Sequence, residues 1–268
     1  LDVVAIGNAI VDVLAPADDD LLERYGLVKG IMRLCDEAFS ERLYDSMAPA
    51  TERSGGSAAN TMAGLASFGG RAGFIGKVRD DQLGEVFGHD IRAAGVEFTG
   101  KPAADGPATA RCLILVTPDA QRTMNTFLGA SVGLAPDDVD DDLVAAASYC
   151  YLEGYLWDER TAKEAMLRVA EVAHRAGRKV SLTLSDPFCV DRHRGEFLWL
   201  LEGHVDVLFA NEAEVVSLFE VDDFDQAMHR VRDRCETAFL TRGVRGSVVA
   251  TGDEVHLVDA YPVPRLVD

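Results

Sequence analysis

Apolar positions recur along this chain with two different periods, and the second half alternates between them. From Ser148 onward, apolar runs of strand length are followed by segments with apolar positions at helical spacing. The predicted strands are 149–153, 179–184, 205–209 and 238–241, and the helices between and after them are 158–176, 211–219 and 224–235. This alternation predicts an α/β fold, a three-layer αβα arrangement with a mostly parallel central sheet.

The first half shows the same rhythm with two interruptions. One strand is expected over 3–13, another over 71–78, and amphipathic helices over 37–47 and 82–94. Segments 14–43 and 98–128 break this order, because the first holds short elements and the second is rich in strand pattern. We therefore expect a small β lid from 14–43 and 98–128, and a large domain from 1–13, 44–97 and 129–268.

A glycine pair lies at the centre of the first half. Gly55-Gly56 permits a sharp turn with close backbone approach, and Ser57 is expected to cap the helix that follows. Asn60 falls in the first turn of that helix, beside its free N–H groups. The helix is expected to bury a face made of Ala58, Met62, Leu65 and Phe68. The stretch reads either as an ordinary helix start after a turn or as a site for a polar ligand.

Two polar residues interrupt the first predicted strand. Asn8 and Asp12 share a face by the period of two, and a carboxylate in an apolar run is costly unless something binds it. They would lie roughly 13 Å apart at ~3.3 Å per residue. That span is too long for one metal ion and suits a ligand with several polar groups. The alternative is an aspartate that caps a nearby loop.

Composition narrows the class of protein. The 268 residues suffice for one large α/β domain with a small accessory unit, and the net charge of −19 argues against nucleic acid as a partner. Five scattered cysteines and six scattered histidines show no metal-binding spacing. No apolar run approaches the ~20 residues of a membrane helix. No secretion signal precedes the first strand, so we expect a cytoplasmic protein with no membrane partner.

Two further motifs follow predicted strands in the second half. Asn211 with Glu214 forms either a capping box or a site where Glu214 holds Mg²⁺ through water near nucleotide phosphates. The loop from Thr241 through Gly243 to Gly246 is either a hairpin connection or a phosphate-binding loop. The sequence contains neither a Walker loop nor a Gly-x-Gly-x-x-Gly turn, so P-loop kinases and typical nicotinamide enzymes are not supported.

Taken together and in this order, the motifs resemble the ribokinase-like (PfkB) carbohydrate and nucleoside kinases, and within them the adenosine kinases. The residues that carry the resemblance are Gly7-Asn8 with Asp12, Gly55-Gly56 with Asn60, Gly76-Lys77 with Asp80-Asp81 and Gly84, Asn211 with Glu214, Thr241 with Gly243 and Gly246, and the stretch 182–188. The resemblance covers essentially the whole chain. One departure is Arg79, where many relatives have glycine.

The resemblance implies a role for each matching residue. It assigns substrate binding to Asn8, Asp12, Gly56, Ser57, Asn60, Tyr155 and Leu34. Arg122 would face the transferred phosphate and Glu214 the metal. ATP would lie against Asn211, Thr241, Gly243 and Gly246. The family's Gly-Ala-Gly-Asp segment is absent from this sequence, and we expect it, with the catalytic aspartate, beyond Asp268.

These implications amount to one leading hypothesis with two alternatives. The leading hypothesis is an ATP-dependent kinase that phosphorylates the 5′-hydroxyl of adenosine or a related nucleoside, with Mg²⁺ as cofactor. A PfkB-type kinase of fructose, ribose or a similar sugar is the first alternative. A non-catalytic nucleoside-binding module is the second. The sequence leaves open whether a monovalent cation assists, and whether the protein is a monomer or a homodimer.

Overall fold

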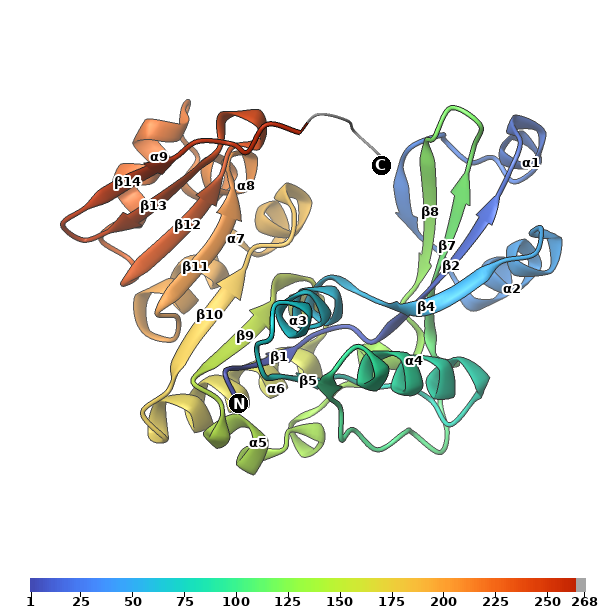
Figure 1. Cartoon of the computed structure of the whole chain (residues 1–268), viewed down its shortest axis with the longest axis horizontal. Helices are drawn as coiled ribbons and strands as arrows, with labels where there is room; N and C mark the ends of the chain where they lie inside the picture. The colour runs from blue at the N-terminus through green and yellow to red at the C-terminus, as the bar shows by residue number, and fades with distance from the viewer. Residues whose placement is uncertain (264–268) are drawn as a thin grey trace. The chain divides into compact units, whose positions relative to one another are not determined.

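The computed structural model describes residues 1–263 and divides into two compact units (Figure 1). Among the described residues, the C-terminal unit consists of Leu1–Ile6 and residues 139–263, and the N-terminal unit is Gly7–Asp138. No helix among the described residues is both long and apolar enough to cross a membrane.

The C-terminal unit is built on a mostly parallel sheet. Its strands lie in the order β14-β13-β12-β11-β10-β9-β1; those from β1 to β12 are parallel, and β13 and β14 are antiparallel to their neighbours. The bounds are β1 Val3–Ile6, β9 Tyr149–Glu153, β10 Lys179–Thr183, β11 Val207–Asn211, β12 Thr237–Thr241, β13 Ser247–Thr251 and β14 Val255–Val258. The predicted α/β rhythm is confirmed.

Register explains the core of this unit. Leu152, Leu182, Leu208 and Ala238 lie opposite one another on successive strands, and all four are buried. Such apolar strands need cover, which helices provide. These are α5 Asp141–Ala146, α6 Arg160–Arg175, α7 Pro187–Gly203, α8 Glu212–Phe219 and α9 Phe224–Val231, with short 3₁₀ helices η3 Gly154–Asp158 and η4 Gly243–Arg245.

The N-terminal unit contains a separate sheet with the strand order β3-β8-β7-β2-β4. Its strands are β2 Ile10–Pro16, β3 Met32–Leu34, β4 Thr51–Gly55, β7 Ala110–Val116 and β8 Arg122–Phe127. Two further strands, β5 Ala72–Ile75 and β6 Val96–Glu97, pair in parallel. The helices are α1 Asp19–Arg24, α2 Glu37–Ser46, α3 Ser57–Ser67 and α4 Gln82–Ala93, with 3₁₀ helices η1 Gly129–Gly133 and η2 Pro136–Asp138. The lid role of residues 14–43 and 98–128 stays a prediction.

Two expectations about local structure were wrong. The segment 3–13 is not one strand, because β1 pairs with β9 while β2 pairs with β4 and β7, and Gly7–Ala9 form the break between them. Ser57 does not cap α3: Gly56 occupies the cap position, and no side chain makes a cap hydrogen bond there. Asn8 therefore lies in the short link between two strands, and Ser57 is already helical.

Candidate functional site

A row of side chains crosses one face of the five-stranded sheet. The strand registers place Leu34 opposite Thr126, Thr126 opposite Cys112, Cys112 opposite Asp12 and Asp12 opposite Arg53. Residues directly opposite in a sheet point to the same face. The Thr126 hydroxyl donates to the Cys112 sulfur at 3.3 Å. Leu34 and Asp12, predicted separately from the sequence, thus belong to one surface.

Asp12 supplies the carboxylate of this row. Burial raises the pKa of its carboxyl group to about 6, so the group is still mostly ionised at neutral pH. No hydrogen bond to this carboxylate is made by the residues that the structure describes. A desolvated carboxylate with unused acceptor sites is suited to hydroxyl donors, of which a vicinal diol supplies two.

The glycine pair Gly55-Gly56 brings the start of α3 close to Asp12 and Asn8. A Cβ atom at Gly55 would lie 2.3 Å from the Asp12 carboxylate, and one at Gly56 would lie 2.4 Å from the Asn8 carbonyl oxygen. Gly56 also has φ +92°, a conformation that favours glycine. Asn8 and Asp12 therefore both pack against the turn that starts α3, and Asn60 is exposed in the first turn of that helix.

Arg122 lies on the same sheet face, but at the other end of its strand. It begins β8, four residues before Thr126, so the two side chains point the same way and lie roughly 13 Å apart at ~3.3 Å per residue. Arg122 is exposed. The structure therefore places this arginine on the face that carries Asp12, at a distance that an extended ligand would have to span.

The C-terminal unit gathers the second group of predicted residues at the carboxyl ends of its strands. Asn211 and Thr241 are register partners, each the last residue of its strand. Both line a surface depression of about 740 Å³, together with Gly243, Glu212 and Arg242 and with residues at the start of α9. Ligands of open parallel sheets bind at this edge. Gly246 lies outside the lining and closes the loop with φ +80°.

Glu214 and Asn211 form a complete capping box. The Asn211 backbone N–H donates to Glu214 Oε2 at 2.9 Å, its side-chain amide donates to Oε1 at 2.6 Å, and the Glu214 N–H donates to Asn211 Oδ1 at 2.9 Å. Burial raises the pKa of Glu214, and the nearby charge of Asp186 raises it further. The helix-capping alternative from the sequence is therefore realised.

The capping box still leaves room for a water-mediated ion. Each Glu214 oxygen accepts one hydrogen bond and keeps a lone pair. Mg²⁺ is often held by one or two carboxylates together with substrate phosphates and water. Among the described residues, no group of three His, Cys, Asp or Glu side chains is placed to hold a metal. Glu214 thus fits a water-mediated contact to Mg²⁺–nucleotide better than an all-protein metal cage.

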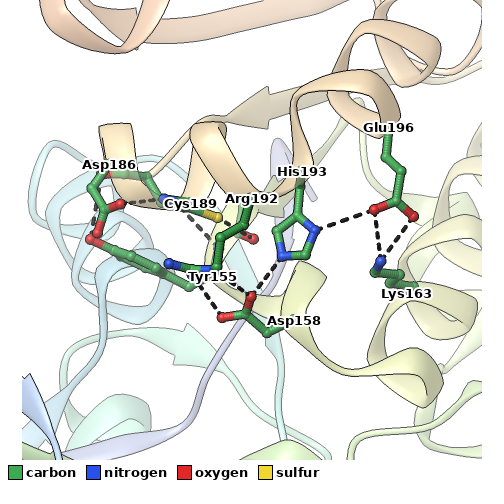
Figure 2. A network of polar contacts seen from close by, with 10 residues as sticks. Tyr155, Asp158, Lys163, Asp186, Cys189, Arg192, His193 and Glu196 are labelled. Carbon is green, nitrogen blue, oxygen red and sulfur yellow. Dashed lines mark hydrogen bonds and ion pairs between the residues drawn. The ribbon is translucent and has the colours of Figure 1, made fainter. Parts of the chain in front are cut away.

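Tyr155 is held by residues that directly follow strand β10 (Figure 2). Its backbone N–H donates to the Ser185 hydroxyl at 3.1 Å, and its phenol hydroxyl donates to the Ser185 carbonyl oxygen at 3.5 Å. Burial is the main cause that raises the pKa of Tyr155. Ser185 has φ +74°, a conformation rare for a residue other than glycine. The predicted base-contacting tyrosine is therefore a fixed side chain, not a mobile one.

Behind Tyr155, the other end of η3 is anchored by charges. Asp158 bonds Arg192 at 2.9 Å and His193 at 2.6 Å, and His193 also contacts Glu196 at 3.2 Å (Figure 2). His193 has non-helical backbone angles inside α7. Figure 2 shows this chain of contacts continuing from Glu196 to Lys163 on α6. The network fixes η3 against two helices.

Several residues of these sites could not be found from the sequence. Cys112, Thr126 and Arg53 join the row only through strand register. Glu212 and Arg242 are adjacent to predicted residues, and that adjacency was the only signal available.

The fold and these two sites define a class, the ribokinase-like small-molecule kinases. The structure aligns with an adenosine kinase from Sinorhizobium meliloti at a TM-score of 0.91 and 52% identity, covering 100% of this chain and 82% of that one. It aligns equally with a probable sugar kinase protein from Rhizobium etli, at 0.91 and 49% identity, covering 100% and 81%.

Sequence comparison defines the family. The chain matches the pfkB family carbohydrate kinases over residues 34–268, and it belongs to that family. An ATP-dependent ribose-1-phosphate kinase of Halopiger xanaduensis is 32% identical over 213 residues, 76% of this chain and 67% of the relative. The guanosine-inosine kinase of Escherichia coli K12 is 26% identical over 275 residues, 97% and 63%. The chain thus spans about two thirds of the length of these relatives.

Proposed function

We propose that the protein transfers the γ-phosphoryl group of ATP to the 5′-hydroxyl of adenosine or a related nucleoside. The observation that carries the proposal is the desolvated Asp12 carboxylate, packed on Gly55 beside the start of α3. In this role Asp12 accepts hydrogen bonds from the ribose hydroxyls, with Asn8 and Asn60 as further polar contacts. The 52% identity to an adenosine kinase supports the choice of nucleoside.

Apolar residues at the β3 end of the row that carries Asp12 favour a nucleoside over a bare sugar. Leu34 ends the row, and the exposed side chains of Ile31 and Met32 lie next to it in sequence. A purine ring needs apolar contact area that a free sugar does not. In this proposal Leu34 contacts the base, whereas Arg122 faces the transferred phosphate.

Phosphoryl transfer requires positioning and charge neutralisation more than covalent chemistry from the protein. The hydroxyl oxygen attacks the γ-phosphorus, ADP leaves, and the hydroxyl proton is released to a base. The family's catalytic aspartate, predicted beyond Asp268, lies outside the described residues. Bound Mg²⁺ would neutralise phosphate charge, and Glu214 would hold it through water. Thr241, Gly243 and Gly246 would hold the nucleotide beside Asn211.

A sugar kinase is the second candidate, because a probable sugar kinase protein is 49% identical and a ribose-1-phosphate kinase is 32% identical. The test is phosphate transfer from ATP by the full-length protein to adenosine, guanosine, inosine, fructose, ribose and ribose 1-phosphate. We expect the highest kcat/KM with adenosine. Faster turnover of a sugar would establish the second candidate. Adenosine binding without transfer to any acceptor would establish a non-catalytic nucleoside-binding module.

A further inference from the structure

The loop that follows β12 buries no apolar side chain. Gly243 and Gly246 have φ +57° and +80°, and the Val244 side chain is 95% exposed. Within the loop, the Arg242 N–H bonds the Gly246 carbonyl at 2.8 Å and the Arg245 N–H bonds the Arg242 carbonyl at 3.1 Å. No apolar side chain of this loop enters the core, so polar ties to its neighbours act together with the β12–β13 pairing at Thr241 and Ser247 to set its position.

Glu212 provides those ties. It is the first residue of α8, directly after Asn211, and its Oε2 accepts from Arg242 Nε at 3.2 Å and from Arg245. The Arg242 guanidinium also lies 3.9 Å from the centroid of the Phe224 ring, which begins α9. One arginine therefore joins the loop to the starts of two helices.

Arg242 and Arg245 differ in how exposed their side chains are. The Glu212 and Arg242 side chains are 26% and 22% exposed, while Arg245 is 60% exposed. Exposed ion pairs contribute little, whereas a partly shielded pair with a stacked guanidinium is better held. The Glu212–Arg242 pair is therefore the main tie, and Arg245 is peripheral.

We propose that Glu212 is a positioning residue for nucleotide binding, which acts through Arg242 to hold the loop Thr241–Gly246 in register with the start of α8. This rests on the proposed function, in which Thr241 and the loop N–H groups contact phosphate while Asn211 and Glu214 face the same nucleotide. In the alternative arrangement Arg242 and Arg245 bind the nucleotide phosphates directly, and the Glu212 carboxylate competes with the phosphates for the two arginines. The two arrangements predict opposite effects of removing the Glu212 charge.

The experiment measures Mg²⁺–ATP binding by calorimetry, and KM and kcat for ATP and adenosine separately. For Glu212→Gln and for Arg242→Gln we expect the ATP Kd and KM to rise about three- to tenfold, with the adenosine KM unchanged. The double variant is expected to bind ATP no more weakly than the single variant with the lower affinity, since both substitutions remove the same contact. Glu202→Gln is the matched control, because Glu202 pairs with Arg234, and neither lines the depression.

The outcomes separate the alternatives. Unchanged or tighter ATP binding in Glu212→Gln, or additive losses in the double variant, would overturn the proposal. A parallel loss of adenosine affinity and unfolding midpoint would also overturn it, because that pattern indicates a general structural role. If the unaltered protein fails to bind Mg²⁺–ATP at all, the proposed function falls as well.

Discussion

At the scale of single residues, function and stability oppose each other at Asp12. Its carboxylate has a pKa of about 6 in the folded protein, against 3.8 for an ordinary aspartate, because burial disfavours the charged form. The folded state therefore binds the proton more tightly than the unfolded state. The contribution of this group to stability is complete below about pH 4 and is lost as the pH rises through 6.

Asp12→Asn removes that partly buried charge and keeps the shape. We expect the free energy of unfolding to rise by about 1–3 kcal/mol at pH 7, a gain that disappears below pH 4. Adenosine affinity should fall at least tenfold, which is about 1.4 kcal/mol. Urea unfolding at both pH values and calorimetry check this. Asp45→Asn, at an exposed position, is the control. Equal stability of Asp12→Asn and the unaltered protein at pH 7 would contradict the prediction.

Gly55 makes a second prediction at this scale. Alanine there would set a methyl group 2.3 Å from the Asp12 carboxylate, so Gly55→Ala should cost about 1–3 kcal/mol and weaken nucleoside binding. Gly64 lies in α3, where a Cβ atom would have no neighbouring atom within 4 Å, and Gly64→Ala should be neutral or stabilising by up to about 1 kcal/mol. Thermal unfolding of both variants compares them. A Gly55→Ala protein as stable as Gly64→Ala would refute the proposed contact.

At the scale of elements, most helices begin at a side chain that caps their free N–H groups. Aspartate side chains cap the helices α1, α2, α4, α5, α7 and α9, and Asn211 caps α8. At α3 the cap is Gly56, because a side chain would meet the Asn8 carbonyl. Gly56 therefore contributes no side chain to this helix start, unlike the aspartate and asparagine caps of the other helices named here.

The buried face of α3 differs from the expected one. Ala58 and Met62 are buried as predicted, but Phe68 is the C-cap residue and is 92% exposed. Met62→Ala should lower the free energy of unfolding by about 2–5 kcal/mol, whereas Phe68→Ala should change it by less than about 0.5 kcal/mol. Chemical denaturation of the two variants gives the comparison. A large loss in Phe68→Ala would show that this ring is covered in solution.

At the scale of the whole molecule, the net charge of −19 produces self-repulsion that the helix caps and ion pairs offset only in part. Salt screens this repulsion over a Debye length of about 10 Å at 0.1 M. We expect the unfolding midpoint to rise when NaCl is increased from about 0.02 M to about 0.3 M, measured by thermal unfolding at pH 7.5. A midpoint that falls with salt would mean that favourable ion pairs outweigh the repulsion.

Sequence periodicity was sufficient for most of the fold. Local patterns predicted the strands and helices from Ser148 onward, since each apolar strand and amphipathic helix is specified by its own side chains. They failed at 3–13, where an apolar stretch that contains Gly7-Asn8 serves two strands with different partners. Pairing partners are chosen by the rest of the chain, so the local pattern alone did not show that Gly7-Asn8 separate two strands.

The sequence by itself determined which residue types carry the chemistry: a carboxylate in an apolar strand, a glycine pair, and an asparagine and a threonine after buried strands. Only the tertiary structure decided what each one faces. Strand register set Asp12 in line with Cys112, Thr126 and Leu34, and put Asn211 beside Thr241. The physical reason is that burial and pairing arise from contacts between distant segments, and these contacts also desolvate Asp12 and tie Glu212 to Arg242.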